Sequence, residues 1–438
     1  MRTLPVFALG AALFALSGCI EENVPLSSNN SPATPFPVAR GSATRQSASA
    51  SADNIAQQAQ SINAFATDMY TRLSSGDGNL FFSPYSITAA LGMTDAGARG
   101  ETQAQIRRAL SVTLAGDDFH AAMNSLDHTL SDHAAGTDGV TLNIVNSSWM
   151  QTGWDFKVTY LDLLARYYGA GVNLLDFAAE PDPARIIINT WVAEQTNEKI
   201  KDLIPAGAIT SLTRLVLTNA IYFLADWLFQ FDASRTQDEP FTLLDGGTVT
   251  APMMQLGEND KKVSMLYARK DNVRAIDLPY KGDRLCMTVL LPDSGAFQAF
   301  ESSLSADRID SIIQALDSTE LPPVRLPKFT FTTGSISLVR PLKDLGMVDA
   351  FDGAKADFSG IDGRKDLVVS DVIHKAFIAV DEKGTEAAAA TAVIFRFTSV
   401  NPDPPRFVAD RPFMFLIRDR QTGVVLFMGR VLDPTVEG

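Results

Sequence analysis

The segment at residues 382–394, "EKGTEAAAATAVI", constrains the fold more than any other part of the chain. Its four consecutive alanines favour a helix, because alanine is the best helix former. The "VIFRF" stretch at residues 393–397 is β-branched and aromatic, and it favours a strand. Taken alone, residues 385–393 predict a surface helix. One segment is therefore suited to two conformations, and the rest of the chain has to explain why.

Composition excludes several classes of partner and framework. Apolar residues make up 46% of the 438 residues, which is enough for a large core. The formal net charge is −14 and no long Lys/Arg run offsets it, which argues against a nucleic acid or an anionic lipid surface recognised by charge. The two cysteines, Cys19 and Cys286, make neither a disulfide framework nor a zinc motif.

The first residues have the pattern of an export signal. Arg2 is followed by an apolar run from Leu4 to Leu16 and then by small residues, and the run is too short for a mature membrane span. The end, "LSGC", resembles a bacterial lipobox, which implies removal of residues 1–18 and lipidation of Cys19. The alternative is an ordinary secretory signal that ends in cysteine. Because Ile20 rather than Asp follows Cys19, we expect anchoring in the outer membrane if the cell is Gram-negative.

Residues 20–52 are rich in Ser, Ala, Pro, Asn and Thr and have few large apolar side chains. Such a segment buries too little surface to offset the entropy of ordering. We therefore predict that residues 19–52, beginning with the lipidated cysteine, form a disordered tether with a mean reach of roughly 30 Å. A cleavable spacer is the other use open to this segment.

From residue 53 the chain is globular to its end, with helical patterns first and strands later. Residues 53–73 predict an amphipathic helix with Asp53 as N-cap, and residues 182–204 predict a helix of more than four turns. Residues 213–227, a long apolar run with β-branched residues, predict a strand covered on both faces. This order predicts a single α+β domain over residues 53–438.

Motifs of known enzyme classes are absent, including zinc-protease, hydrolase-elbow and nucleotide-binding patterns. His120, His128 and His133 do not share one helical face, so solvated histidines are preferred over a zinc site. For His374 we prefer a buried, hydrogen-bonded histidine over a member of a catalytic triad. Cys286 is better explained as a small core residue than as a reactive thiol. We therefore predict no metal, no cofactor and no enzymatic activity.

Ten segments, in order, resemble the serpin family over almost all of residues 53–436. They include "NLFFSPYSI", "LVLTNAIYFLADW", "IDLPYKGDRLCMTVLLP", "VRLPKFTF", "VIHKAFIAVDEKGTEAAAATAV", "ADRPFMFLIRD" and "FMGRVLDP". The stretch "VDEKGTEAAAATAV" resembles the proximal hinge of the reactive-centre loop in inhibitory serpins. The resemblance implies three β-sheets, eight or nine helices, and an exposed loop at about residues 382–406 that can enter the central sheet as an additional strand.

The loop sequence suits such an insertion. A strand entering a sheet needs alternating side chains, small or apolar ones inward, and no internal proline. Starting at Thr385, the charged residues Glu386 and Arg396 fall outward, and the first proline is Pro402. Gly384 supplies a permissive hinge. The residues assigned to the hinge are Glu382, Gly384, Thr385, Glu386, Ala387, Ala388, Ala389, Ala390 and Thr391.

The resemblance also implies a mechanism, suicide-substrate trapping of a serine endopeptidase. The family's common spacing, counted from Thr385, places the reactive bond at Thr398–Ser399. This bond suits elastase-like or subtilisin-like proteases. Phe397–Thr398 for a chymotrypsin-like enzyme and Arg396–Phe397 for a trypsin-like enzyme remain open alternatives, and a cysteine protease remains a possible target.

The resemblance assigns structural roles to five further residues. Four of them match positions under the opening region of the central sheet: Ser83, Ser86, Asn219 and His374. Trp227 matches the tryptophan near the point of loop entry, with plain core packing as the alternative. We expect a monomeric, exported inhibitor that meets an extracytoplasmic protease. The competing functions are a serpin-fold binding protein that is cleaved without trapping, and a hydrolase.

Overall fold

The computed structural model describes residues 36–76, 78–257, 263–321, 323–385 and 406–436. Residues from Phe36 onward form one compact unit. Cys19, the hinge residues from Glu386 to Thr391 and all candidate reactive bonds from Arg396 to Ser399 lie outside the described residues. The signal and lipidation predictions therefore stay predictions.

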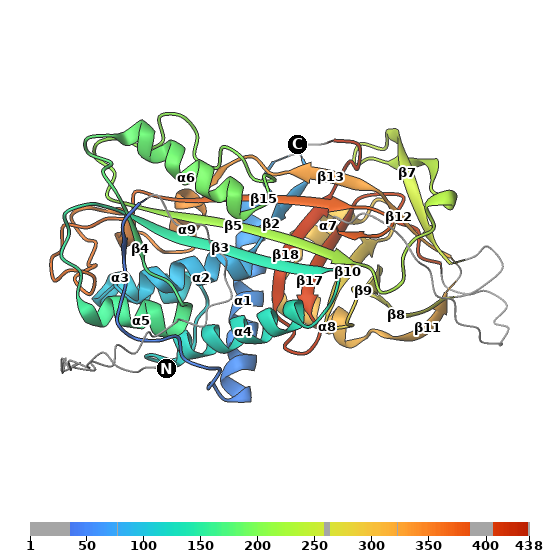
Figure 1. Ribbon diagram of the computed structural model, residues 1–438. Coiled ribbons are helices and arrows are strands. Elements are labelled where there is room, and N and C mark those ends of the chain that lie inside the picture. Colours follow the sequence, from blue (N-terminus) through green and yellow to red (C-terminus); the bar gives the residue numbers. More distant parts are fainter. Residues whose placement is uncertain (1–35, 77, 258–262, 322, 386–405, 437–438) are drawn as a thin grey trace, which may run out of the picture. The chain divides into compact units, whose positions relative to one another are not determined.

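A central sheet of eight strands dominates the unit (Figure 1). Its strands follow the order β1, β4, β3, β5, β16, β15 and β13, with β14 also paired to β15. Their bounds are β1 Val38–Ala39, β4 Val172–Leu175, β3 Val140–Gln151, β5 Leu215–Asp226, β16 Gly384–Thr385, β15 Asp371–Val380, β13 Phe329–Thr332 and β14 Ile336–Ser337. The predicted strand at residues 213–227 is confirmed as β5, which is buried along nearly its whole length because both faces of the sheet are covered.

Two further sheets complete the three expected from the resemblance. The seven-stranded sheet runs β11 Asp317–Leu321, β8 Val263–Lys270, β9 Val273–Pro279, β10 Leu285–Pro292, β17 Phe413–Asp419, β18 Val425–Val431 and β2 Leu80–Phe82. The three-stranded sheet runs β12 Val324–Pro327, β7 Thr248–Leu256 and β6 Gln237–Thr242. Lys328 separates β12 from β13, so one apolar stretch supplies strands to two different sheets.

Nine α-helices and two short 3-10 helices lie within the described residues. They are α1 Ala52–Leu73, α2 Pro84–Asp95, α3 Gly100–Ala109, α4 Asp118–Ala135, α5 Val158–Tyr168, α6 Pro181–Gln195, α7 Phe297–Ser302, α8 Ala306–Gln314, α9 Val339–Asp344, η1 Ala233–Arg235 and η2 Asp349–Phe351. The helix α6 covers one face of the central sheet, and the fully buried α2 packs against the other (Figure 1). The N-cap of α1 is Ser51 rather than the predicted Asp53.

The helix predicted at residues 182–204 is shorter than expected. It ends at Gln195, and Asn197, Glu198 and Asp202 have positive φ angles in the segment that follows. The Asn189 side chain donates to the backbone oxygen of Ile204 and accepts from its nitrogen, so the segment turns back along α6. Continuing the helix would forfeit this packing, which is why tertiary contacts override the helical pattern.

The predicted tether at residues 20–52 is too long. Residues 36–51, which we call the strap, lie against the body of the protein. The short strand β1 pairs with β4 and forms the edge of the central sheet. The ring of Phe36 packs edge-on against Trp149, with 4.8 Å between the ring centroids. Further along, the backbone nitrogens of Ser42 and Ala43 donate to Asp162. The composition of the strap concealed this order, because its partners are backbone groups and polar side chains distant in sequence.

Arg45 and Gln46 anchor the last part of the strap. The guanidinium of Arg45 forms an ion pair with Asp127 and donates to Asn124 on α4. The backbone oxygen of Gln46 accepts hydrogen bonds from Asn124 and His128. The strap thus runs from the edge of the central sheet to the helix α4. Among the described residues no helix combines the length and the apolar character that crossing a membrane would require.

Candidate functional site: the hinge and the seam of the central sheet

The central sheet has a seam between β5 and β15. From Val216 to Ile221, β5 pairs directly and in parallel with residues 371–376 of β15. Toward the C-terminal ends of both strands, the two residues of β16 lie between them and pair with each. The seam is therefore closed along most of its length and already holds two inserted residues at one end.

Those two inserted residues are Gly384 and Thr385 of the predicted hinge. Thr385 is 2% exposed, and its hydroxyl lies 2.8 Å from the hydroxyl of Tyr280. Gly384 pairs with Asp226 and approaches Ala225 so closely that only a residue without a side chain fits. The geometry explains why glycine precedes threonine at this position, since the backbone of β5 occupies the space that a Cβ would need.

Trp227 and Tyr280 form the platform beneath the hinge. Their rings stack 4.5 Å apart with an interplanar angle of 8°. The indole of Trp227 donates to the backbone oxygen of Asp381, and the backbone nitrogen of Trp227 donates to that of Lys383. Trp227, at the predicted point of loop entry, thus contacts the turn that leads into the loop. It is also packed in the core, so the alternative interpretation of Trp227 as a core residue holds as well.

Glu382 is held by a polar clamp. Its carboxylate accepts a hydrogen bond from Thr236 at 2.8 Å and forms an ion pair with Lys328 at 3.0 Å. Burial by itself would raise the pKa of Glu382, but the hydrogen bonds and the charge of Lys328 outweigh it and lower the pKa below its usual value. The charged residue at the base of the loop is therefore fixed to the body as a carboxylate.

A buried polar cluster lies under the seam, halfway along it. Asn146 on β3, Asn219 on β5 and His374 on β15 occupy one cross-strand row. Asn219 accepts from Nδ1 of His374 at 2.5 Å and donates to Asn146 at 2.7 Å. The hydrogen bond between Asn219 and His374 bridges the two strands that would have to separate for a loop to enter.

Two serines at the start of α2 complete the cluster. The hydroxyl of Ser86 donates to Asn146 at 2.6 Å and accepts from Asn219 at 2.6 Å. Ser83 caps α2, and its hydroxyl donates to the backbone oxygen of Leu426. The cluster brings together all four predicted residues, Ser83, Ser86, Asn219 and His374.

His374 is neutral in this environment. It is fully buried, and burial lowers the pKa of His374 to about 3. With Nδ1 donating to Asn219, Nε2 is left to accept from the backbone nitrogen of Ser83 at 3.4 Å. The prediction of a buried, hydrogen-bonded histidine is confirmed, and within the described residues it contacts no serine or cysteine in the manner of a triad.

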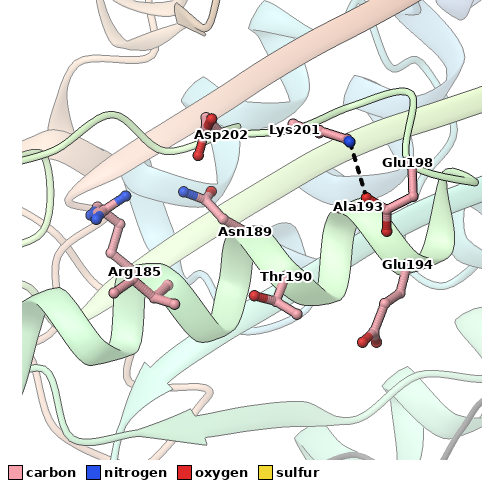
Figure 2. Close-up of a pocket in the computed structure, with 9 residues that line it drawn as sticks. Arg185, Asn189, Thr190, Ala193, Glu194, Glu198, Lys201 and Asp202 are labelled. Carbon is pink, nitrogen blue, oxygen red and sulfur yellow. Dashed lines mark ion pairs between the residues drawn. The ribbon is translucent and has the colours of Figure 1, made fainter.

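The segment after α6 covers the seam from the opposite face. Lys375 on β15 donates to the backbone oxygen of Lys201 at 2.7 Å, which ties that segment to the sheet. A pocket of about 340 Å³ lies between α6 and this segment. The ion pair between Lys201 and Glu198, with 3.3 Å between its atoms, lies among the residues that line it (Figure 2). Insertion of a strand requires this cover to shift, because it spans both sides of the seam.

The other histidines differ from expectation. His120 is buried rather than solvated, and its Nδ1 lies 2.8 Å from the hydroxyl of Tyr168. His133 is mostly covered and lies 2.9 Å from the carboxylate of Asp419. The sequence could not reveal these partners, which come from other elements. Cys286 is fully buried, as predicted. In the described part of the chain, no three His, Cys, Asp or Glu side chains gather in a way that could hold a metal ion.

Four residues of the site escaped the sequence analysis. Asn146 and Tyr280 contribute to the cluster and the platform, and Thr236 and Lys328 form the clamp on Glu382. A signal existed for Asn146, which is a polar residue inside the strand-like stretch "TLNIVNSSWMQ" at residues 141–151. No local signal marks the other three residues, because only the packing of distant segments brings them to the hinge.

Comparison with known proteins gives one consistent result. A family model described as "Serpin (serine protease inhibitor)" matches residues 60–434. An uncharacterized serpin-like protein of Thermococcus kodakarensis is 41% identical over 377 residues, which is 85% of each chain. A protein named leukocyte elastase inhibitor from Bos taurus is 38% identical over 379 residues, covering 84% of this chain and 97% of the relative.

Solved structures agree. A crystal structure described as a highly specific serpin of the insect Tenebrio molitor matches with a TM-score of 0.74 at 30% identity, covering 86% of this chain and 98% of the other. The native state of a thermophilic serpin, tengpin, matches with a TM-score of 0.78 at 26% identity, covering 89% and 97%. The residues matched by the family model, 60–434, include the seam and the described part of the hinge. The chain belongs to the serpin family and has the serpin fold.

Proposed function

We propose that this protein inhibits serine proteases as a suicide substrate, with residues 382–406 as the reactive-centre loop. The observation that carries the proposal is the position of β16. Gly384 and Thr385 lie between β5 and β15, in antiparallel register with both. The loop has thus taken the first step of an insertion that the remainder can follow.

The two registers agree on where the loop would go. Thr385 pairs with Ala225 on β5 and with Val380 on β15. Continued for six residues, both registers place Thr391 between Asn219 and His374. Opening the seam breaks the hydrogen bond between those two side chains. The hydroxyl of Thr391 both donates and accepts, so it is suited to replace the lost bond from each side.

The mechanism is the one that the resemblance to inhibitory serpins implies, and the position of β16 supports it. The serine oxygen of the protease attacks the carbonyl carbon of Thr398, the bond to Ser399 breaks, and the amine of Ser399 leaves with a proton from the protease's own base. The new ester joins the protease to a strand that enters the seam. The free energy of insertion carries the protease away from the hinge and distorts its active site before water can attack. In this scheme the inhibitor supplies no catalytic group.

The relatives and the loop support a target with a modest binding pocket. Relatives named leukocyte elastase inhibitor, from Bos taurus and Xenopus tropicalis, are 38% and 37% identical. Thr398 preceded by Phe397 suits elastase-like or subtilisin-like enzymes. Cleavage after Phe397 or Arg396 would instead indicate a chymotrypsin-like or trypsin-like target, and a cysteine protease could be trapped by the same loop as a thioester.

We further propose that the protein is exported and anchored by a lipid on Cys19, as a monomer. Residues 1–18 would be removed, and the tether would extend from Cys19 to the strap, whose first residue is Phe36. The target would then be an extracytoplasmic protease. The support is the lipobox-like "LSGC" and the polar composition of residues 20–35.

The test is to incubate the protein with elastase, subtilisin, chymotrypsin and trypsin in turn. We expect an SDS-resistant conjugate with at least one of them and a released fragment whose N-terminal sequence begins at Ser399. A fragment beginning at Thr398 would place the reactive bond at Phe397–Thr398, and a fragment beginning at Phe397 would place it at Arg396–Phe397. Cleavage by all four enzymes without any conjugate would favour a serpin-fold binding protein that does not trap.

A further inference from the structure

The strap determines the position of Phe36, the first described residue, at the edge of the central sheet. Pairing in the central sheet places Val38 opposite Asn173, Asn173 opposite Trp149, and Trp149 opposite Val216. These residues form one row across β1, β4, β3 and β5. The continued registers of the loop place its residue 394 in the same row, next to Val216 and to Asp371 of β15.

The distance across that row follows from the spacing between neighbouring strands. Four strand-to-strand steps separate Val38 from the inserted residue 394, which amounts to about 19 Å. Because β1 runs parallel to β5 while an inserted loop runs antiparallel to it, the chain before Val38 and the chain after residue 394 point toward the same end of the sheet. This is the Leu215 end of β5, opposite to the hinge at Ala225.

From these positions we infer that the tether and the trapped protease share one pole of the molecule, and that residues 20–35 are a spacer whose length makes room for the protease at the membrane. The inference rests on the proposed trapping of a protease at Thr398 and on the proposed lipid anchor at Cys19. Thr398 would lie about 13 Å beyond residue 394, and Phe36 about 7 Å beyond Val38. The acylated protease therefore arrives beside the point where the anchor begins.

The lengths show why a spacer is needed. A protease of about 240 residues is roughly 45 Å across, from its expected radius of gyration. Residues 20–35 number sixteen. A flexible chain of sixteen residues would have a mean reach of about 22 Å, and sixteen fully extended residues would span about 55 Å. Their full extension therefore accommodates the protease, whereas a tether of a few residues would not.

The experiment uses residues 19–438, which retain every described residue. The thiol of Cys19 is coupled to vesicles that carry a maleimide lipid, so the test does not depend on natural lipidation. Cys286 does not compete, because it is fully buried and burial raises its pKa to about 12. The variant lacks residues 20–31, and a control replaces those twelve residues with Gly and Ser at equal length.

Conjugate yield per cleaved inhibitor is measured with the protease identified above, free in solution and on vesicles. We expect equal yields for all three chains in solution. On vesicles, the shortened chain should yield several-fold less conjugate than the other two, with its loop still cleaved at the normal rate. Equal yields on vesicles for all three chains would overturn the spacer inference alone. No conjugate even in solution would instead remove the proposed function, and the spacer inference with it.

Discussion

Gly384 lies so close to Ala225 that a Cβ on Gly384 would stand 2.0 Å from the carbonyl oxygen of Ala225. Gly384→Ala should therefore force β16 out of the seam, and overpacking of this kind costs about 1–3 kcal/mol of unfolding free energy. The same pair is needed in the inserted state, so conjugate yield should fall as well. Denaturant unfolding and the conjugate assay measure both effects.

Gly353→Ala is the matched control, since nothing lies within 4 Å of a Cβ at Gly353 and its φ is not positive. Its stability should stay within about 0.5 kcal/mol of the natural protein. If Gly384→Ala behaved like Gly353→Ala in both assays, the close approach at the hinge would not matter for function.

Thr385→Arg should convert the inhibitor into a substrate. Thr385 is buried against Tyr280, and an unpaired charge there would have to leave water at the first step of insertion. The cost is at least about 2 kcal/mol, enough to slow insertion by about tenfold or more. The protease would then complete hydrolysis first. Thr385→Ser keeps the hydroxyl and should trap normally, whereas full trapping by Thr385→Arg would contradict the insertion mechanism.

His374 should make stability depend on pH. Burial lowers the pKa of His374 from its usual 6.5 to about 3, so the unfolded chain binds a proton below about pH 6.5 that the folded chain refuses until about pH 3. Across that window the free energy of unfolding falls as pH falls, by about 1.4 kcal/mol per pH unit for this histidine. The side chains that face His374 across the seam, Asn219 and Asn146, are uncharged.

His374→Asn should therefore lower the slope of the unfolding free energy against pH by about 1.4 kcal/mol per pH unit between pH 6 and pH 4. Denaturant titration at each pH measures this free energy. His120 titrates in the same direction, because burial lowers its pKa to about 3, and it remains in both proteins. Between pH 7 and pH 9 the two curves should run parallel. Equal slopes in the acid range would mean that His374 is protonated in the folded protein.

Phe36→Ala should release the strap without unfolding the protein. Phe36 is 6% exposed and packs on Trp149, and truncation of a buried phenylalanine costs about 3–5 kcal/mol where the rest of the structure stays in place. This loss of free energy is larger than the stabilisation that a two-residue edge strand such as β1 is expected to supply. Residues 36–51 should therefore detach. Trypsin should then cut after Arg40 and Arg45, with fragments beginning at Gly41 and Gln46. Protection equal to that of the natural protein would show that Phe36 does not hold the strap.

Cleavage within residues 386–405 should raise the melting temperature well above that of the intact protein. The central sheet would gain a strand along the seam from Ala225 to Leu215, with the backbone hydrogen bonds and burial that this brings. Calorimetry before and after limited digestion measures the change. An unchanged melting temperature would show that the intact fold stores no strain.

Local pattern in the sequence was sufficient for much of the fold. The amphipathic pattern of residues 53–73 and the apolar run of residues 213–227 each predicted the element that is observed, α1 and β5. These signals are local because side-chain patterning follows directly from backbone geometry. The family resemblance added the number of sheets and the identity of Ser83, Ser86, Asn219 and His374 as neighbours.

Tertiary structure decided what no local pattern carries. The end of α6 at Gln195 depends on the hydrogen bonds from Asn189 to Ile204, and the order of the strap depends on β4, Trp149 and Asp162. Composition predicts disorder for the strap because it reports only the apolar side chains of the segment itself. It carries no information about the groups elsewhere in the fold against which the segment packs.

By itself, the sequence determined a hinge of glycine, threonine and small residues that can adopt strand or helix. Only the folded chain decided that Gly384 and Thr385 lie in the seam, that Tyr280 contacts Thr385 there, that Lys328 pairs with Glu382, and that residues 36–51 lie against the body of the protein. The reason is that conformational preference belongs to a residue and its neighbours in the chain, whereas several partners at the seam, such as Ala225 and Tyr280, come from strands and turns more than a hundred residues away from Thr385.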